Sequence, residues 1–115
     1  MYHSFEELEV WQRSSKIAVR MYELTREGLD HGLKSQMTRA AVSIASNIAE
    51  GAERNSFKEF SRFLYIARGS AAELRTQTYV AYKIGFLNQE EKDEIVDELI
   101  EISKMLFGLA QSLKT

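Results

Sequence analysis

Apolar side chains recur at spacings of three and four residues along four stretches of the chain, the period of one buried face of an α-helix. These stretches run from about Glu6 to Glu27, Gln36 to Glu50, Phe57 to Ile84 and Gln89 to Leu113. The connections between them are short, and strand patterns are missing. The sequence therefore predicts an all-α protein, an up-down-up-down antiparallel four-helix bundle in which residues 1–115 form a single domain.

Each predicted helix carries one line of apolar residues that we expect to face the core. In chain order these are Leu8, Trp11, Ala18, Met21, Tyr22, Met37, Ala41, Ile44, Ile48, Ala52, Phe60, Phe63, Ala67, Leu74, Ala81, Ile95, Leu99, Ile102, Leu106 and Leu113. The third helix also contains Gly69 and Ser70. These small residues are expected where another backbone passes closely.

Capping residues mark where the helices should begin and end. Ser35 is expected to cap the second helix and Asn88 the fourth, because their side chains can accept hydrogen bonds from free backbone N–H groups. Gly51 is a candidate left-handed cap at the end of the second helix, and Gly85 is expected to end the third. The segment SNIAEGAERNS, residues 46–56, is thus predicted to contain a helix–helix corner.

The composition excludes several classes of protein. The chain has no cysteine and no proline, so it has neither disulfides nor a thiolate metal site. Its N-terminus does not resemble an export signal, and no stretch approaches the roughly 18 apolar residues of a membrane span. We therefore expect a cytoplasmic protein with no membrane partner.

Charge is unevenly distributed along the chain. The net charge is −2, which argues against a strongly basic nucleic-acid binder. Residues 1–87 nevertheless carry 12 basic against 10 acidic residues, whereas residues 88–115 carry 3 against 7. The acidic excess is therefore confined to the C-terminal part.

The basic residues around the third helix fall within about 80° of one line at roughly 100° per residue. They are Arg54, Lys58, Arg62, Arg68, Arg75 and Lys83, with Tyr65 and Tyr79 in the same sector. We call these eight residues the basic stripe. Lysine and arginine interleaved with aromatic rings suit a surface that follows phosphates and stacks on bases. An ordinary solvated helix face, opposite a core stripe, has the same pattern.

The predicted outer side of the fourth helix is acidic and offers the stripe a second kind of partner. Its acidic residues are Glu90, Glu94, Asp97, Glu98 and Glu101. If they paired with the basic stripe of a neighbouring subunit, the stripe would serve assembly rather than nucleic-acid binding.

A polar line on the second helix consists of Arg39, Ser43, Ser46, Asn47 and Glu50. A hydrolase would use Glu50 as a base and a serine as nucleophile, but the only histidines, His3 and His31, are isolated from this line in the sequence. We therefore expect no enzyme, no catalytic residue, no metal site and no cofactor. The residues expected to serve packing or subunit contacts are Arg39, Ser43, Asn47, Glu50, Gly51, Gly69 and Ser70.

The segments LEVWQRSSKIAVRMYELT, QMTRAAVSIASNIAEGAERNSFKEFSRFLYIARGSAAEL and YKIGFL resemble the four-helix-bundle family of bacterial 23S ribosomal RNA intervening sequences. The resemblance covers nearly the whole chain, although Ala45 stands where the family often has proline. It implies a protomer that forms a ring-like homopentamer. It also implies kinship with the accessory variability protein of diversity-generating retroelements, which binds nucleic acid and a reverse transcriptase. The family has no established catalytic activity.

Two functions follow as hypotheses. The first is a non-enzymatic, oligomeric scaffold that binds RNA or DNA through the basic stripe and presents it to a protein partner such as a reverse transcriptase. The second is a self-assembling protein-interaction module with no role in nucleic-acid binding. Exposure of the stripe in the assembled protein distinguishes the two hypotheses.

Overall fold

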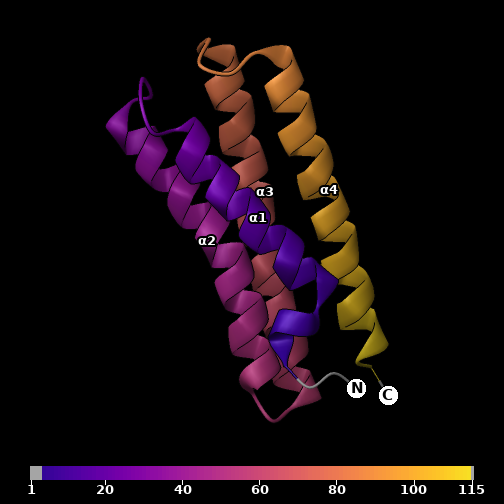
Figure 1. Cartoon of the computed structure of the whole chain (residues 1–115). Coiled ribbons are helices and arrows are strands. Elements are labelled where there is room, and N and C mark those ends of the chain that lie inside the picture. Colours follow the sequence, from indigo (N-terminus) through magenta and orange to yellow (C-terminus); the bar gives the residue numbers. More distant parts are fainter. Residues whose placement is uncertain (1–3, 115) are drawn as a thin grey trace.

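The computed structural model describes residues 4–114 and contains four α-helices preceded by a short 3-10 turn (Figure 1). The turn η1 covers Phe5–Glu7, and the helices are α1 (Glu9–Leu24), α2 (His31–Glu53), α3 (Phe57–Lys83) and α4 (Gln89–Ser112). No strand occurs among the described residues. The predicted all-α four-helix bundle is confirmed.

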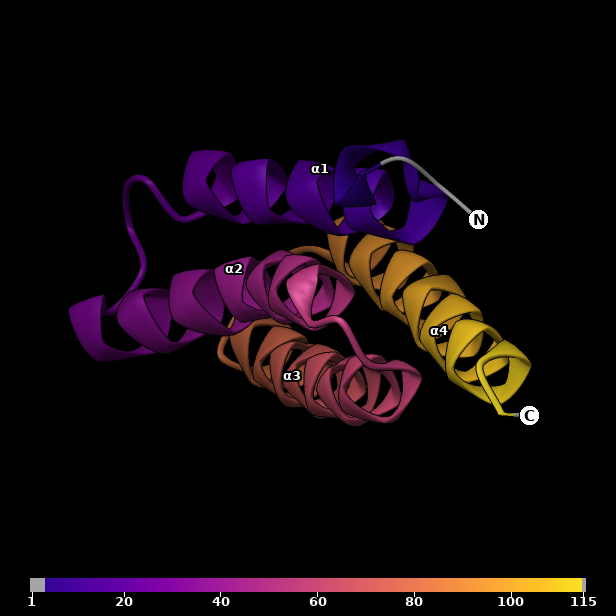
Figure 2. The same ribbon diagram turned by 90° about the horizontal axis from the view of Figure 1, so that it is seen from below.

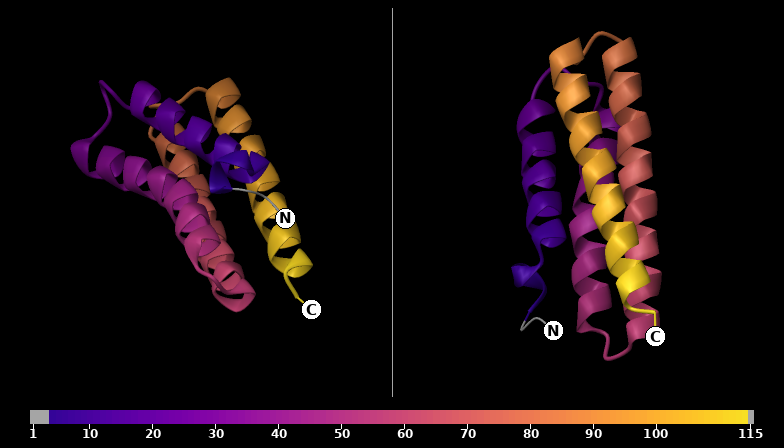
Figure 3. Two further views of the ribbon diagram at one scale, coloured as in Figure 1. Left: turned by 60° about the horizontal axis from the view of Figure 1, so that its bottom comes forward. Right: turned by 90° about the vertical axis from the view of Figure 1, so that its right-hand side faces the viewer.

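The helices follow one another up and down in an elongated bundle of 46 × 19 × 19 Å. Helix α3 packs along both α2 and α4, whereas α1 packs along α2 and meets α4 over a shorter length. In Figure 2, α1 lies on one side of α2 and α3 on the other. Figure 3 shows α3 and α4 side by side along their whole length. The bundle is therefore most extensively packed around α3 and least around α1.

The core runs through all four helices, and its largest fully buried apolar side chains are Met21, Met37, Ile44, Ile48, Leu64, Leu74, Ile95, Leu99, Ile102 and Leu106. The inward residues predicted for the third and fourth helices are all buried. Tyr22 was wrongly placed in the core, because its side chain is 51% exposed. The buried line of α1 instead passes through Ser14, Ile17, Met21 and Thr25, one step around the helix from Tyr22.

The helix ends agree only partly with the predicted caps. Asn88 caps α4 in a complete capping box with Glu91, as expected from the sequence. At the end of α3, Gly85 has a φ of +86°, and the next N–H, of Phe86, donates to Ala81 O at 2.9 Å. This is the Schellman arrangement that a glycine favours.

Two cap predictions were wrong, and both concern α2. Its cap is Asp30, whose carboxylate accepts from Leu33 N–H, so the helix starts earlier than Ser35 would allow. Gly51 is not a left-handed cap, because it lies inside the last turn of α2 with a negative φ. The helix consequently continues to Glu53, and Arg54 becomes its C-cap rather than part of the next helix.

Gly51 is instead a point of close contact between α2 and α3. A Cβ atom at this position would lie 2.6 Å from Phe63 Cβ and 3.3 Å from the Phe60 carbonyl oxygen. These distances leave no room for a side chain. The glycine therefore lets the two helices approach closely just before the corner that joins them.

Candidate nucleic-acid interface

The structure places seven of the eight stripe residues on α3, while Arg54 caps α2 at the corner. All eight side chains are exposed except that of Arg75, which is half-buried. The stripe consequently extends along the full length of α3. The groups around the stripe differ in three places: at the corner, beside the C-terminal half of α4 and beside the start of α4.

At the corner, acids neutralise much of the positive charge. Arg54 pairs with Glu50 at 3.2 Å, as expected from their spacing of four residues, and Arg62 pairs with Glu59 at 3.2 Å. Hydrogen bonding to Arg62 lowers the pKa of Glu59 below its usual range. Both guanidinium groups lie over the Phe63 ring, at 5.0 and 4.6 Å from its centre. These two arginines are therefore already occupied.

Midway along α3, the stripe borders a hollow of about 340 Å³ between α3 and α4. Its lining consists of Tyr65, Arg68, Gly69, Ala72, Arg75 and Ser103. We call this the basic hollow. Among residues 4–114, no carboxylate forms an ion pair with Arg68 or Arg75. The basic hollow therefore has two uncompensated positive charges.

Aromatic side chains from both helices border the basic hollow. The Arg68 guanidinium lies 5.0 Å from the centre of the Phe107 ring, which meets Tyr65 edge-on at 6.5 Å. The Tyr65 hydroxyl accepts a hydrogen bond of 2.8 Å from Gln111 Nε2. Tyr65 and Phe107 remain exposed by 39% and 44%. Ring surface is thus available next to the two arginines that have no acidic partner.

Gly69 opens the basic hollow rather than admitting another backbone. A Cβ atom built on Gly69 would meet no atom within 4 Å. The expectation of a close backbone passage at this point of α3 was therefore wrong within the protomer. Ser70, next to it, is buried, and its hydroxyl shares a hydrogen bond with that of Ser43 on α2. The role of Gly69 in subunit contacts stays a prediction.

Near the start of α4, the stripe meets a cluster of tyrosines and lysines. Lys83 Nζ lies 5.9 Å from the Tyr82 ring, and Lys92 Nζ lies 5.0 Å from Tyr82 and 5.7 Å from Tyr79. A hydrogen bond to Asp93 raises the pKa of Lys92. The sequence alone did not indicate Lys92, Phe107 and Gln111, because their place beside the stripe depends on how α4 packs against α3.

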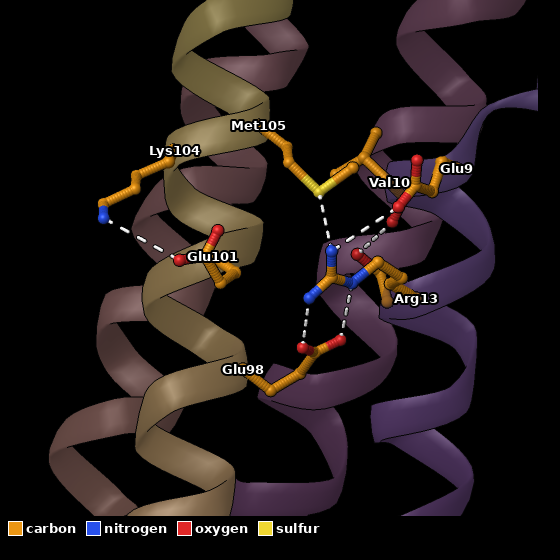
Figure 4. Close-up of polar contacts among 8 residues, drawn as sticks. Glu9, Val10, Arg13, Glu98, Glu101, Lys104 and Met105 are labelled. Atoms are coloured by element: carbon orange, nitrogen blue, oxygen red, sulfur yellow. Dashed lines mark hydrogen bonds and ion pairs between the residues drawn. The ribbon is translucent and has the colours of Figure 1, made fainter.

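The acidic residues of α4 are largely occupied within the protomer. Glu98 forms a two-pronged ion pair with Arg13, and Glu94 pairs with Arg20 at 3.0 Å, so both acids hold α1 against α4. Arg13 also contacts Glu9 and Met105, as Figure 4 shows. Glu101 lies 3.8 Å from Lys104. Of the five acids proposed to meet a neighbour's stripe, three therefore already have partners.

The polar residues of the α2 line are hydrogen-bonded within the bundle or lie on different faces of the helix. The Ser43 and Ser70 hydroxyls share a hydrogen bond of 2.9 Å, and Asn47 Nδ2 donates to Ser43 O and Ser43 Oγ. Asn47 thus bonds its own helix and not another one. Ser46 lies on a different face, in an apolar groove with Trp11.

Within residues 4–114, the side chains weighed for a nucleophilic site or a metal site lie apart from one another. Glu50 is paired with Arg54, and His31 lies at the start of α2, while His3 lies outside the described residues. Within residues 4–114, no group of three or more His, Cys, Asp or Glu side chains could hold a metal ion. No described helix is both long and apolar enough to cross a membrane.

Comparisons with known proteins agree with this architecture. A crystal structure from Bacteroides thetaiotaomicron, described as a protein with unknown function from the S23 ribosomal protein family, superposes with a TM-score of 0.78. The two chains are 25% identical, and the match covers 88% of this chain and 97% of the other. No curated protein matches. A model of the 23S rRNA-intervening sequence protein family matches residues 6–108. The chain therefore belongs to the 23S rRNA-intervening sequence protein family.

Proposed function

We propose that this protein is a non-enzymatic, oligomeric scaffold that binds RNA or DNA through the basic hollow. The observation that carries the proposal is the pair Arg68 and Arg75, which line one hollow and lack acidic partners among residues 4–114. Phosphate oxygens supply the negative charge that this site lacks. Single-stranded nucleic acid suits it best, because unpaired bases can stack on the exposed rings of Tyr65 and Phe107.

The rest of the stripe contributes unequally to this proposal. Lys58 and Lys83 are exposed and form no ion pair with any described residue, so they can extend a phosphate path toward both ends of α3. Arg54 and Arg62 would first have to leave Glu50 and Glu59. We therefore assign the main electrostatic contribution to Arg68 and Arg75. A reverse transcriptase remains a candidate partner through the resemblance described above.

A specific surface supports self-assembly as a second function. An apolar groove of about 350 Å³ lies between the N-terminal part of α1 and α2, lined by Phe5, Trp11, Ser15, Ala18, Val42, Ala45, Ser46 and Ala49. Val19 and Tyr22 are exposed on α1, and Ile66 and Val80 on α3. The protomer thus has one apolar surface on α1 and α2 and another on α3, and two different surfaces suit a head-to-tail contact that closes into a ring. A homopentamer is the ring we propose, in line with the family resemblance.

The test is binding of a fluorescent single-stranded RNA over a salt series. We expect the affinity for RNA to fall as the salt concentration rises. The double variant Arg68→Glu/Arg75→Glu should weaken binding and flatten the slope of log affinity against log salt concentration by about 1.4, the value for two phosphate contacts on a single strand. Lys16→Glu/Arg26→Glu makes the same change of charge at exposed residues in and just after α1 and should have a smaller effect. Arg62→Glu should also have a small effect.

Sedimentation velocity on the same samples separates the two functions. If the wild-type protein sediments as an assembly and still does not bind RNA at low salt, nucleic-acid binding is contradicted and the self-assembling module remains as the function. Equal losses in both double variants would show that only total charge matters and would remove the basic hollow from the proposal. A monomeric mass for the wild type would contradict the pentamer.

A further inference from the structure

A second hollow lies on the other side of α3, where it packs against α2. Its volume is about 470 Å³, and its lining consists of Gln36, Arg39, Ala40 and Ser43 from α2 with Glu73 and Gln77 from α3. We call it the polar hollow. It shares no lining residue with the basic hollow, which lies on the α4 side. Neither proposed function uses it.

One residue that lines the polar hollow, Gln77, has a buried hydrogen-bond acceptor without a donor. Gln77 is only 8% exposed, and its Oε1 has no hydrogen-bond partner among the described residues. A buried amide oxygen in this condition is unfavourable and calls for a donor. Rotation about the last side-chain torsion, which is broad for glutamine, can turn this oxygen toward the hollow.

The two walls of the polar hollow have opposite hydrogen-bonding character. On α3, Glu73 and Gln77 are four residues apart and therefore neighbours, so the Glu73 carboxylate and Gln77 Oε1, once it is turned toward the hollow, together make a wall of acceptors. On α2, Arg39 contributes a fork of donors. Within residues 4–114, neither Arg39 nor Glu73 forms an ion pair, although both line the same space. A ligand with donors on one edge and acceptors on another would complement both walls.

We propose that the polar hollow binds a guanine base, an inference that rests on the proposed nucleic-acid function. The N1–H group of guanine donates to the Glu73 carboxylate, and its 2-amino group donates to Gln77 Oε1. Its O6 and N7 atoms accept from the Arg39 fork, the commonest specific contact of arginine with a base. Adenine has no N1–H and presents an amino group in place of O6, so it meets donors with a donor. The base comes from a free guanine nucleotide or from an unpaired position in RNA.

Calorimetry with three nucleotides tests the hydrogen bonds of the base. GMP, IMP and AMP bear the same phosphate, so any contribution of the basic stripe is equal in all three. IMP lacks only the 2-amino group of GMP. We expect GMP to bind at least tenfold more tightly than IMP, and AMP to bind more weakly still. Equal affinities for the three nucleotides would overturn the proposal, even if RNA binding by the basic hollow holds.

Variants connect this selectivity to the two α3 residues. Glu73→Gln changes an exposed side chain and should reduce GMP affinity at least tenfold, and Gln77→Leu should remove most of the difference between GMP and IMP. Glu53→Gln and Gln89→Leu are the same changes at exposed positions elsewhere and should have no effect. Arg68→Glu/Arg75→Glu should keep the GMP preference while weakening RNA binding. Wild-type selectivity in Glu73→Gln would contradict the assigned contacts.

RNA oligonucleotides distinguish the two sources of the base. A uridine decamer with one central guanine is compared with the same decamer carrying inosine, and with a hairpin in which that guanine is paired. A preference for guanine in the open decamer that disappears in the hairpin identifies an unpaired base in RNA. Selectivity for GMP without selectivity among the RNAs identifies a free nucleotide. Selectivity in neither set would contradict the guanine site.

Discussion

Helices α2 and α3 approach each other closely at a glycine and at a pair of serines, whereas the contact between α1 and α4 includes two pairs of long charged side chains. At the first contact, Gly51 lies against Phe63 and the Ser43 and Ser70 hydroxyls share a hydrogen bond. At the second, Arg13 and Arg20 reach across to Glu98 and Glu94. The first contact should therefore be sensitive to added volume and insensitive to salt, and the second should show the opposite behaviour.

The largest expected effect is that of Gly51→Ala. The new Cβ atom would lie 2.6 Å from Phe63 Cβ, so the helices must separate or the ring must move. We expect a loss of about 2 kcal/mol in the free energy of unfolding, within the range for overpacked cores. Urea denaturation at fixed protein concentration measures this loss, at 0.05 M and 0.5 M NaCl. A strong dependence of the loss on salt would contradict the steric cause.

A smaller effect is expected at the charged contact. A double-mutant cycle with Arg13→Leu and Glu98→Leu should give a coupling of about 1 kcal/mol at low salt, because the pair is two-pronged but about a third exposed. The coupling should fall in 0.5 M NaCl. An equal coupling at both salt concentrations would remove the distinction between the two contacts.

The same cycle should not respond to alkaline pH. Hydrogen bonding to Glu98 raises the pKa of Arg13 above its already high ordinary value. Stability from a raised pKa is fully present below the unfolded-state pKa and is lost only as pH rises through the folded-state pKa. The Arg13 contribution should therefore be constant between about pH 6 and 9. A coupling that declines over this range would contradict the assignment.

The smallest change in the free energy of unfolding is expected for a second glycine-to-alanine substitution, and its sign is opposite to that of Gly51→Ala. Gly69→Ala places the same methyl group on the open face of α3, where nothing lies within 4 Å. We expect a gain of about 0.5–1 kcal/mol, since glycine inside a helix costs that amount relative to alanine. The same urea measurement applies. A loss would instead place another subunit against Gly69, as the sequence analysis predicted for assembly.

Much of the fold could be predicted because helical periodicity reports the core directly. The third and fourth helices were predicted to within one residue, since Ser56, Gly85 and Asn88 mark their ends with local hydrogen bonding. The start of α2 was misplaced because two glycines near it suggested a loop, yet the Asp30 carboxylate is sufficient to cap the helix. Gly51 was misread for a related reason. A glycine needed for close packing looks the same in sequence as one needed for a turn.

The candidate site was predictable only as far as one helix determines it. The alignment of basic residues along α3 follows from the sequence alone. The pairing of Glu94 and Glu98 with α1 does not, because it depends on how the helices are placed around one another. For the same reason, Gln77 attracted no attention in the sequence. Its unpaired oxygen becomes evident only once the packed helices bury it.

The limited contact of α1 with the rest of the bundle has a consequence for how the protein opens. Helix α1 is the shortest of the four, packs mainly on α2 and meets α4 over a shorter length that includes two ion pairs. Local unfolding begins where cooperative contacts are fewest. Its amides should therefore exchange with solvent through an opening that leaves α2, α3 and α4 folded. The protein would then behave as a folded unit of α2, α3 and α4 from which α1 can separate, and this separation exposes the buried side chains of Ile17 and Met21.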